Sequence, residues 1–211
     1  MQIFLLTGGI GTGKSLAANH LSKHGAGIVD TDEITKLITA KDGIAIPMLA
    51  NAFGNKSLTE NGELDRDYMR NLIFNNEIAK LKLEEVLHPL IQVYAMQKAK
   101  HLEYIKPYLK YILYVVPLFI GKNQAFWHSQ VQKVITVESD YSVRIQRIMH
   151  RGLSQDMAAK IIQQQPANEE YRASADYIIE NNSSYADFIS KLDDLNIILK
   201  RKLHTARQHI F

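Results

Sequence analysis

The sequence predicts an α/β fold built on a parallel β-sheet. The chain opens on a short apolar strand that runs directly into a glycine-rich turn. A helix and a second strand follow within about 30 residues, and the strands of such a βαβ unit run parallel. Helical stretches then separate further short strands rich in β-branched residues, and 46% of the 211 residues are hydrophobic, as in an ordinary globular domain.

Apolar spacing and stop signals predict the elements in chain order. Residues 3–6 are predicted to form the first strand, residues 16–21 a helix that Gly25 ends, and residues 27–29 the second strand. From residue 33 to about residue 106 the pattern is helical. Further strands are expected over residues 110–116, 131–137 and 177–179, and further helices over residues 140–150, from Ser154 to Pro166, and over residues 185–203.

Two residues of the long helical stretch carry specific expectations. Asp65 is suited to cap a helix whose apolar face holds Met69, Leu72 and Ile73. Pro89 has no backbone N–H, so we expect the helix to break or kink before it.

Composition excludes several classes of protein. The 25 basic and 22 acidic residues give a net charge of 25 − 22 = +3. A positive charge this small suits binding of a small polyanion, and it gives no support to binding of nucleic acid or membrane. The chain has no cysteine, which excludes disulfides, thiolate catalysis and cysteine zinc sites. Without a recognisable signal peptide or an apolar run of membrane-spanning length, we expect a cytoplasmic location. The basic residues 200–207 are expected to form a solvated helix end.

Residues 8–15, which we call the phosphate loop, match the pattern Gly-x-x-x-x-Gly-Lys-Ser in full. Glycines let successive backbone N–H groups point into one anion-sized hollow, and the helix that follows aims its positive end there. Lys14 adds a mobile charge for the outer phosphates, and the Ser15 hydroxyl is a hard oxygen ligand suited to Mg²⁺. The alternative is a glycine-rich turn with a chance Lys-Ser pair, but the position between a strand and a helix favours phosphate binding.

Three absences narrow the class of phosphate-binding protein. No Asp is followed three residues later by Gly, so the usual GTPase switch signature is missing. Residues 55–58 lack the Asp that reads guanine, and the third strand ends in Val115-Val116-Pro117 in place of the acidic pair of a typical motor ATPase. Of these classes of phosphate-loop protein, a small-molecule kinase remains.

Asp30 and Asp32 follow the second predicted strand, at the sheet edge that faces ligands in parallel α/β proteins. If the segment is extended, alternation puts both carboxylates on one side. One of them can accept a hydrogen bond from the acceptor hydroxyl or hold Mg²⁺ through water. The alternative is an ordinary Asp cap at the end of a strand.

Two sets of arginines are spaced along predicted helices. Arg144, Arg147 and Arg151 would present three guanidinium groups on one helix face, suited to phosphate oxygens and to a lid over the loop. Arg66 and Arg70 form a second pair, which could clamp the phosphates of the acceptor. For both sets the alternative is a solvated basic face.

The sequence resembles the dephospho-CoA kinase family through nearly its whole length. The most specific segments are Gly62-Glu63-Leu64-Asp65-Arg66, Leu87-His88-Pro89 and Ala175-Asp176-Tyr177 with Asn181, taken together and in order. The other matching segments are residues 6–15, 30–32 and 116–118, Arg70 with Phe74, Arg147 with Arg151, and Gln165.

The resemblance implies a three-layer phosphate-loop kinase fold with a five-stranded parallel sheet. It implies a core of residues 1–34, 108–140 and 172–211, a helical CoA-binding insertion over about 35–107, and a lid over about 141–171. It also implies transfer of the ATP γ-phosphoryl group to the ribose 3′-hydroxyl of dephospho-CoA with Mg²⁺, by a monomer or small homo-oligomer whose partners are these small molecules.

The resemblance also assigns roles to residues. Asp32 takes the position of the base, and with Lys14 and Arg147 it forms the expected catalytic set. Ser15 is the expected metal ligand. ATP contacts are expected at Gly8, Gly9, Ile10, Gly11, Thr12, Gly13, Lys14, Ser15, Leu16, Arg151 and Asn181, the last near the adenine, and acceptor contacts at Thr7, Asp32, Arg66, Arg70 and His88.

Two positions depart from the family pattern. The family usually has Glu shortly after Val-Pro-Leu, whereas residues 119–122 contain none, and Gly121 is the departure we single out. Arg144 stands where Gln is common. Two alternatives to a dephospho-CoA kinase stay open: a nucleoside or nucleotide kinase with another acceptor, and a nucleotide-binding scaffold that has lost catalysis.

Overall fold

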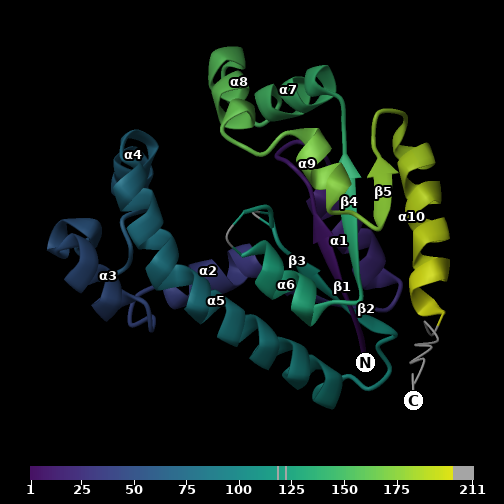
Figure 1. The fold of residues 1–211 in the computed structure, drawn as a ribbon, viewed down its shortest axis with the longest axis horizontal. Helices are drawn as coiled ribbons and strands as arrows, with labels where there is room; N and C mark the ends of the chain where they lie inside the picture. Colours follow the sequence, from purple (N-terminus) through teal and green to yellow (C-terminus); the bar gives the residue numbers. More distant parts are fainter. Residues whose placement is uncertain (118, 122, 202–211) are drawn as a thin grey trace, which may run out of the picture. The chain divides into compact units, whose positions relative to one another are not determined.

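The structure is a computed structural model that describes residues 1–117, 119–121 and 123–201 (Figure 1). The predictions that fall on Leu118, on Lys122 and on the chain after residue 201 lie outside the described residues. In chain order the elements are β1 (Gln2–Thr7), α1 (Lys14–Lys23), β2 (Ala26–Asp30), α2 (Thr31–Ile38), α3 (Ile46–Phe53), the 3₁₀ turn η1 (Asn55–Ser57), α4 (Arg66–Asn75), α5 (Glu77–Ile105), β3 (Tyr111–Val115), α6 (Gln124–Gln130), β4 (Lys133–Glu138), α7 (Tyr141–Met149), α8 (Gln155–Gln163), α9 (Asn168–Ala173), β5 (Tyr177–Glu180) and α10 (Tyr185–Lys200).

The chain divides into two compact units. One, which we call the sheet unit, holds Met1–Ile28 and the described residues from Lys106 onward, and the other, the helical unit, holds Val29–Ile105. The expected division into core, insertion and lid at the boundaries given above stays a prediction.

The predicted parallel sheet is confirmed. Five strands lie in the order β2-β3-β1-β4-β5. In the centre of the sheet, β1 runs parallel to both neighbours, with Leu6 opposite Val115 on one side and opposite Ile135 on the other. Because β1 is central, its continuous apolar run is buried on both faces, which is typical of parallel sheets.

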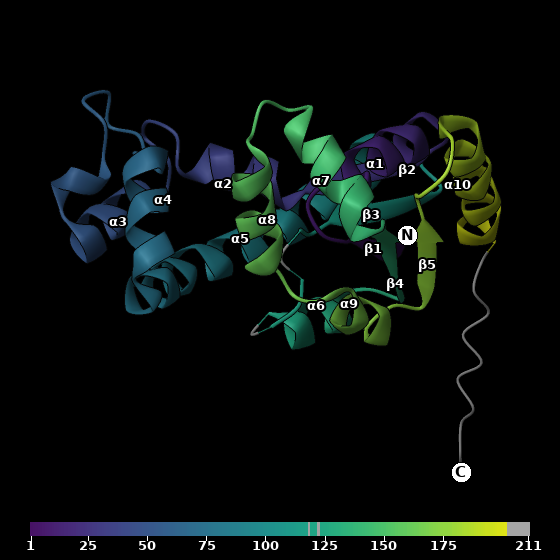
Figure 2. The same cartoon turned by 90° about the horizontal axis from the view of Figure 1, so that it is seen from above.

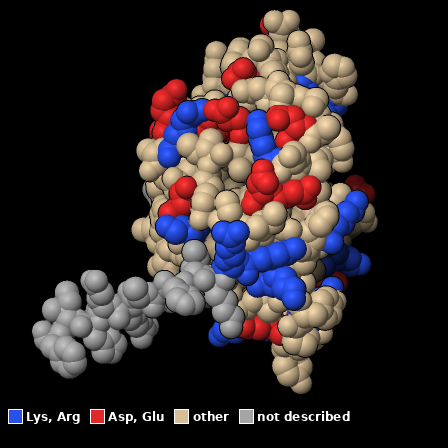
Figure 3. Space-filling view, turned by 90° about the vertical axis from the view of Figure 1, so that its right-hand side faces the viewer, with Lys and Arg blue, Asp and Glu red and all other residues tan. Residues whose placement is uncertain are grey.

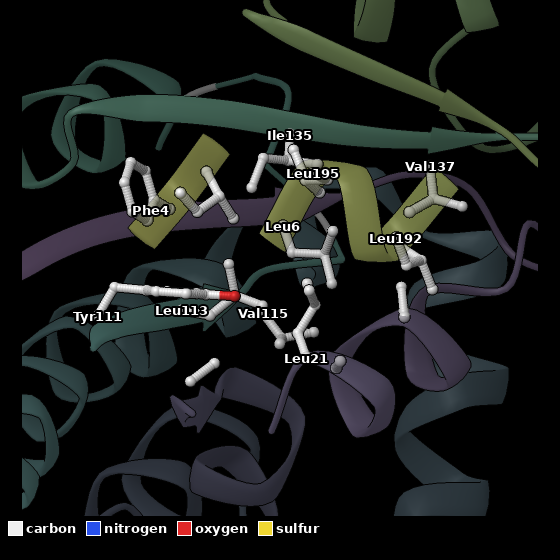
Figure 4. Packing of buried hydrophobic residues seen from close by; sticks show 14 of the residues in the cluster. Phe4, Leu6, Leu21, Tyr111, Leu113, Val115, Ile135, Val137, Leu192 and Leu195 are labelled. Atoms are coloured by element: carbon white, nitrogen blue, oxygen red, sulfur yellow. The ribbon is translucent and has the colours of Figure 1, made fainter. Parts of the chain in front are cut away.

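Helices cover both faces of the sheet within the sheet unit (Figure 2). On one face, side chains of β1 such as Phe4 and Leu6 pack with Leu21 of α1 and with Leu192 and Leu195 of α10 (Figure 4). Burying each such side chain contributes about 1.5–3 kcal/mol. On the other face, α6 and α9 contribute the buried aromatic side chains of Trp127 and Tyr171. The ring centroid of Trp127 lies 5.5 Å from that of Tyr114 on β3. The sheet unit therefore has the three layers that the fold class requires.

The helical unit packs around α5, which contacts α2, α3 and α4. Of the expected break or kink before Pro89, the break is wrong, because α5 continues through that residue, and the kink stays a prediction. Pro89 removes one hydrogen bond from the helix. Buried Leu87 and Ala95 lie on either side of it, so packing holds the two halves in one helix. The predicted cap is confirmed, since the Asp65 carboxylate accepts bonds from the N–H groups of Asp67 and Tyr68.

Among the described helices, none combines the length and the apolar character that crossing a membrane requires. The face that carries α10 shows acidic and basic side chains side by side (Figure 3). An ion pair on this helix joins Lys191 to Asp187 at 2.9 Å. The closing helix ends at Lys200, and Leu203, where the sequence predicts its end, lies outside the described residues.

Candidate active site

The phosphate loop connects the end of β1 to the first turn of α1, as its spacing predicts. Gly8 has φ +137°, and a side chain there would clash with the carbonyl of Val137 on the neighbouring strand β4. Gly13 has φ +105° and packs against the side chain of Asn181. Only glycine fits these two positions, so the loop can wrap tightly and point its amides toward one hollow.

Buried hydroxyls hold the loop in shape from inside. Thr12 Oγ1 donates to the carbonyl of Gly9 at 2.9 Å. Thr7, at the end of β1, donates from its Oγ1 to the carbonyl of Val116 at 2.8 Å and so ties the base of the loop to the segment after β3. Both threonines are almost fully buried, so these bonds position the loop backbone.

Lys14 folds back over the loop that precedes it. Its Nζ donates to the carbonyl of Gly8 at 2.6 Å and to that of Gly9 at 3.4 Å. Ser15 follows in the first turn of α1 and is exposed, while Leu16 packs against the core. The structure thus places a cation and a hydroxyl oxygen beside each other at the positive end of a helix.

Arg144 links the phosphate loop to the segment that follows α8. Its Nε donates to the carbonyl of Ile10 at 2.9 Å, and its Nη2 donates to Gln165 Oε1 at 3.0 Å. The same Gln165 oxygen accepts from the N–H of Ile10 at 2.8 Å. Nη1 donates to Asn168 Oδ1 at 3.2 Å. Arg144 is only 4% exposed, so it is a buried residue that fixes the loop at Ile10. For Arg144 this contradicts the alternative of a solvated basic face.

Arg147 holds the carbonyl side of the same loop. Its Nη1 donates to Gly11 O at 3.2 Å and to Ser139 Oγ at 2.9 Å, and it lies 3.4 Å from Thr12 O. Its Nη2 donates to the backbone and side-chain oxygens of Asn181, at 3.0 and 3.1 Å. Desolvation lowers the pKa of Arg147, and the nearby charge of Arg151 lowers it further. An anion bound beside Arg147 would favour the charged guanidinium again.

Asn181 lies beneath the loop at the carboxyl end of β5. Its Nδ2 donates to the carbonyl of Thr12 at 2.8 Å, and it is 5% exposed. The predicted role of Asn181 near adenine stays a prediction. Its hydrogen bonds in the structure include those with Thr12, Arg147 and Ser139.

The expectation of three guanidinium groups on one helix face is wrong. Helix α7 ends at Met149, so Arg151 lies in the turn after it and is exposed. Gly152, with φ +93°, follows in that turn. The chain leaves the helix before the spacing of i and i+7 can bring Arg151 onto the face that Arg144 and Arg147 share.

In the helical unit, the two predicted acidic residues occupy different structural positions. Asp30 is the N-cap of α2, and its carboxylate accepts from the N–H of Asp32 at 2.8 Å. Asp32 lies in the first turn of α2 and is exposed. The expected alternation along an extended segment is therefore wrong, because the helix already begins at Thr31. Asp30 takes the role of the ordinary cap, and the catalytic role of Asp32 stays a prediction.

The predicted acceptor residues of the helical unit lie on α4 and α5. Arg66 opens α4 and is exposed, with its Nη2 3.3 Å from Thr39 Oγ1. Arg70 is exposed and pairs with Asp67 at 2.8 Å on its own helix. His88 is partly buried in α5. Arg66 thus reaches the buried Thr39 and Arg70 pairs at the surface, and each of these contacts uses one of the five N–H donors of a guanidinium group.

Three residues of the loop network were not predicted as site residues. They are Gln165, Asn168 and Ser139, which bind Arg144 or Arg147. Gln165 directly precedes Pro166, which disfavours a helix at that position, so the sequence signals the end of α8 but not the bond from Gln165 to the loop. At Gly121, the departure from the family, the backbone has φ +110°, a conformation that a glutamate would adopt only with strain.

A phosphate loop that follows the central strand of a five-stranded parallel sheet, with cations around it, is the arrangement expected of a phosphate-loop kinase. The family profile described as dephospho-CoA kinase matches residues 2–187. The chain belongs to the dephospho-CoA kinase family, whose members are phosphotransferases that use ATP.

Relatives of similar length support this membership. The dephospho-CoA kinase of Ralstonia nicotianae is 36% identical over 200 residues, which cover 93% of this chain and 98% of the relative. The dephospho-CoA kinase of Burkholderia pseudomallei is 36% identical over 193 residues, covering 90% and 92%.

Solved structures resemble the whole chain as well. A crystal structure from Thermus thermophilus aligns with a TM-score of 0.77 at 27% identity, and the dephospho-CoA kinase of Campylobacter jejuni with 0.61 at 26%. Each alignment covers 94% of this chain and 97% of the other. A shikimate kinase from Acinetobacter baumannii, at 18% identity and a TM-score of 0.51, covers 96% of both chains and shares the fold.

Proposed function

We propose that this protein transfers the γ-phosphoryl group of ATP to the ribose 3′-hydroxyl of dephospho-CoA, giving coenzyme A and ADP. The observation that carries the proposal is the phosphate loop with Lys14 at the start of α1, in a chain of this family. The O–P bond to the leaving ADP breaks, a bond from the ribose oxygen to phosphorus forms, and the proton of the hydroxyl is released.

The loop amides and the amino end of α1 bind the phosphates of ATP in this proposal. Lys14 then exchanges the carbonyls of Gly8 and Gly9 for phosphate oxygens, because an ionised acceptor forms the stronger bond. Arg147 is close enough to the loop, through Gly11 and Thr12, to stabilise negative charge in the transition state.

Magnesium fits the residues that follow the loop. Ser15 places an exposed hydroxyl oxygen in the first turn of α1, and Mg²⁺ prefers hard oxygen ligands shared between protein and phosphate. Ser15 would hold the ion. Bound there, Mg²⁺ would neutralise charge on the phosphates.

Asp32 is the proposed base or orienting group for the ribose hydroxyl. The sheet topology supports it, because the loop follows β1 and Asp32 follows β2 of the same sheet. Asp30 is occupied as the cap of α2, whereas Asp32 is exposed in its first turn. In-line transfer needs the hydroxyl oriented more than it needs a strong base.

Arg66, Arg70 and His88 are the proposed contacts of the acceptor. Both arginines are exposed, and each guanidinium has donors beyond its present contact, which suits the phosphates of dephospho-CoA. The cytoplasmic location and the oligomeric state stay predictions.

An acceptor assay tests the proposal. Purified protein with ATP and Mg²⁺ is given dephospho-CoA, adenosine, AMP, UMP or shikimate, and release of ADP is measured beside ATP alone. We expect turnover that depends on dephospho-CoA. Turnover with another acceptor would identify a different small-molecule kinase, and absence of turnover with every acceptor would favour a scaffold that has lost catalysis.

A further inference from the structure

Two histidines and an aspartate meet where α1 packs against α10, at residues to which the proposed kinase reaction gives no role. His20 and His24 lie one turn apart on α1, and Asp193 lies on α10. One potential ligand atom from each of the three residues lies within 4.8 Å of the other two. Among the described residues, this is the one cluster of three such side chains.

The two histidine rings lie close to each other and to Asp193. Their centroids are 4.3 Å apart, and His20 Nε2 lies 2.7 Å from Asp193 Oδ1. His24 Nδ1 lies 2.8 Å from the carbonyl of His20, and a carbonyl can only accept. The proton of a neutral His24 ring is therefore on Nδ1, which leaves the lone pair on Nε2. A carbonyl bond of this kind fixes the tautomer of most metal-binding histidines.

The backbone that carries these side chains is rigid. His20 is followed by buried Leu21, and Asp193 lies between buried Leu192 and Leu195, all in the core of the sheet unit (Figure 4). The His20 side chain is 12% exposed and that of Asp193 51%, so the cluster is supported from inside and open to solvent from outside. Ligand atoms of a tetrahedral Zn²⁺ lie about 3.3 Å apart, so metal binding requires side-chain rotations that bring the three ligand atoms closer together.

We propose that His20, His24 and Asp193 bind a transition-metal dication of the Zn²⁺ class, which joins α1 to α10. Imidazole nitrogen selects such metals over Mg²⁺, which prefers oxygen ligands, so the site is chemically distinct from that of Mg²⁺ and ATP. Three protein ligands leave a fourth position for water. A hydrogen bond that only joins the two helices needs His20 and Asp193 alone, and it gives no role to His24, whose ring lies close to that of His20 and has its tautomer fixed.

Zinc titration of the untagged, nucleotide-free full-length protein tests the site. Calorimetry should show one saturable Zn²⁺ site per chain, and Co²⁺ as a probe should give the visible absorption of a tetrahedral nitrogen and oxygen site. Excess Mg²⁺ should leave the Zn²⁺ isotherm unchanged. Absence of saturable Zn²⁺ binding, or displacement of Zn²⁺ by Mg²⁺, would overturn the proposal.

Two variants separate metal binding from helix packing. His24→Ala removes an exposed ligand and should weaken Zn²⁺ binding about tenfold or more, a loss that even indirect ligand partners can cause. Asp193→Asn keeps an acceptor for His20 but removes the charge, so it should weaken Zn²⁺ binding while the metal-free melting temperature stays the same. Wild-type affinity in both variants would overturn the assignment.

Two controls address the other histidines. His150 is exposed and has the same bond from Nδ1 to the carbonyl four residues earlier, at 2.8 Å, but it belongs to no such cluster among the described residues. His150→Ala should therefore leave the isotherm unchanged. The variant with His204→Ala and His209→Ala tests the C-terminal histidines of the sequence in the same way. Loss of the Zn²⁺ site in either control would overturn the proposal.

Discussion

The two units of the protein hold their arginines in different ways. In the sheet unit, Arg144 is buried and Arg147 partly buried, and both donate to carbonyls of the phosphate loop. In the helical unit, Arg66 and Arg70 are exposed: Arg66 donates to Thr39 at the end of α2, and Arg70 pairs with Asp67 on its own helix. The first pair is pre-organised by the fold and also stabilises it. The second pair lies exposed, so its guanidinium groups can bind a ligand as well.

The largest expected effect comes from Asp32→Asn. Removing a general base lowers kcat by about 10²–10⁴-fold, and the exposed position means that stability should not change. ATP binding should persist, which can be measured by calorimetry beside single-turnover kinetics. Asp30→Asn is the matched control, because asparagine caps a helix as well as aspartate does. Equal losses of kcat in the two variants would contradict the role of Asp32.

Lys14→Ala should reduce kcat by about 10²–10³-fold and weaken ATP binding as well, because the variant loses a charged donor to the phosphates. Steady-state kinetics and ATP titration measure the two effects. Lys23→Ala, at the exposed end of the same helix, is the control and should leave both unchanged. Normal ATP affinity in Lys14→Ala would show that the loop binds phosphate without the ammonium group.

Arg147→Ala sharpens the comparison because it should affect stability as well as catalysis. It removes the guanidinium donor from the carbonyl of Gly11 and from Asn181 Oδ1, so the free energy of unfolding should fall by about 1–3 kcal/mol. Urea denaturation followed by circular dichroism measures this change. The exposed Arg151 gives the contrast, since Arg151→Ala should leave the free energy of unfolding unchanged. In kinetics, Arg147→Ala should lower kcat, and a rise in KM alone would argue against a role in the transition state.

The smallest effect is expected from Arg70→Ala in the helical unit. Its pairing with Asp67 is exposed and contributes at most about 1 kcal/mol, so stability should be nearly unchanged. The KM for dephospho-CoA should rise, by about tenfold for the loss of one charge-assisted bond, while the KM for ATP stays constant. If Arg70→Ala destabilised the protein as much as Arg147→Ala, the distinction between the two pairs would fail.

Local signals explain which parts could be predicted. The phosphate loop, the cap at Asp65 and the parallel strands each depend on residues close together in the chain. The start of α2 at Thr31 also has a local signal, because Asp30 is suited to cap a helix. The expectation of an extended segment at Asp30–Asp32 did not take this cap into account. The continuity of α5 through Pro89 could not be predicted from local signals, because packing along the helix outweighs one missing hydrogen bond.

The sequence by itself determined the chemistry of the loop, because glycine, lysine and serine at that spacing impose a backbone shape and a charge wherever they follow a strand. Tertiary structure alone decided the partners of the arginines. Arg144 and Gln165 meet at Ile10 through elements far apart in the chain, and Asp193 meets His20 only because α10 packs on α1. Burial fixes such contacts, since a polar group removed from water must find a partner wherever the fold provides one.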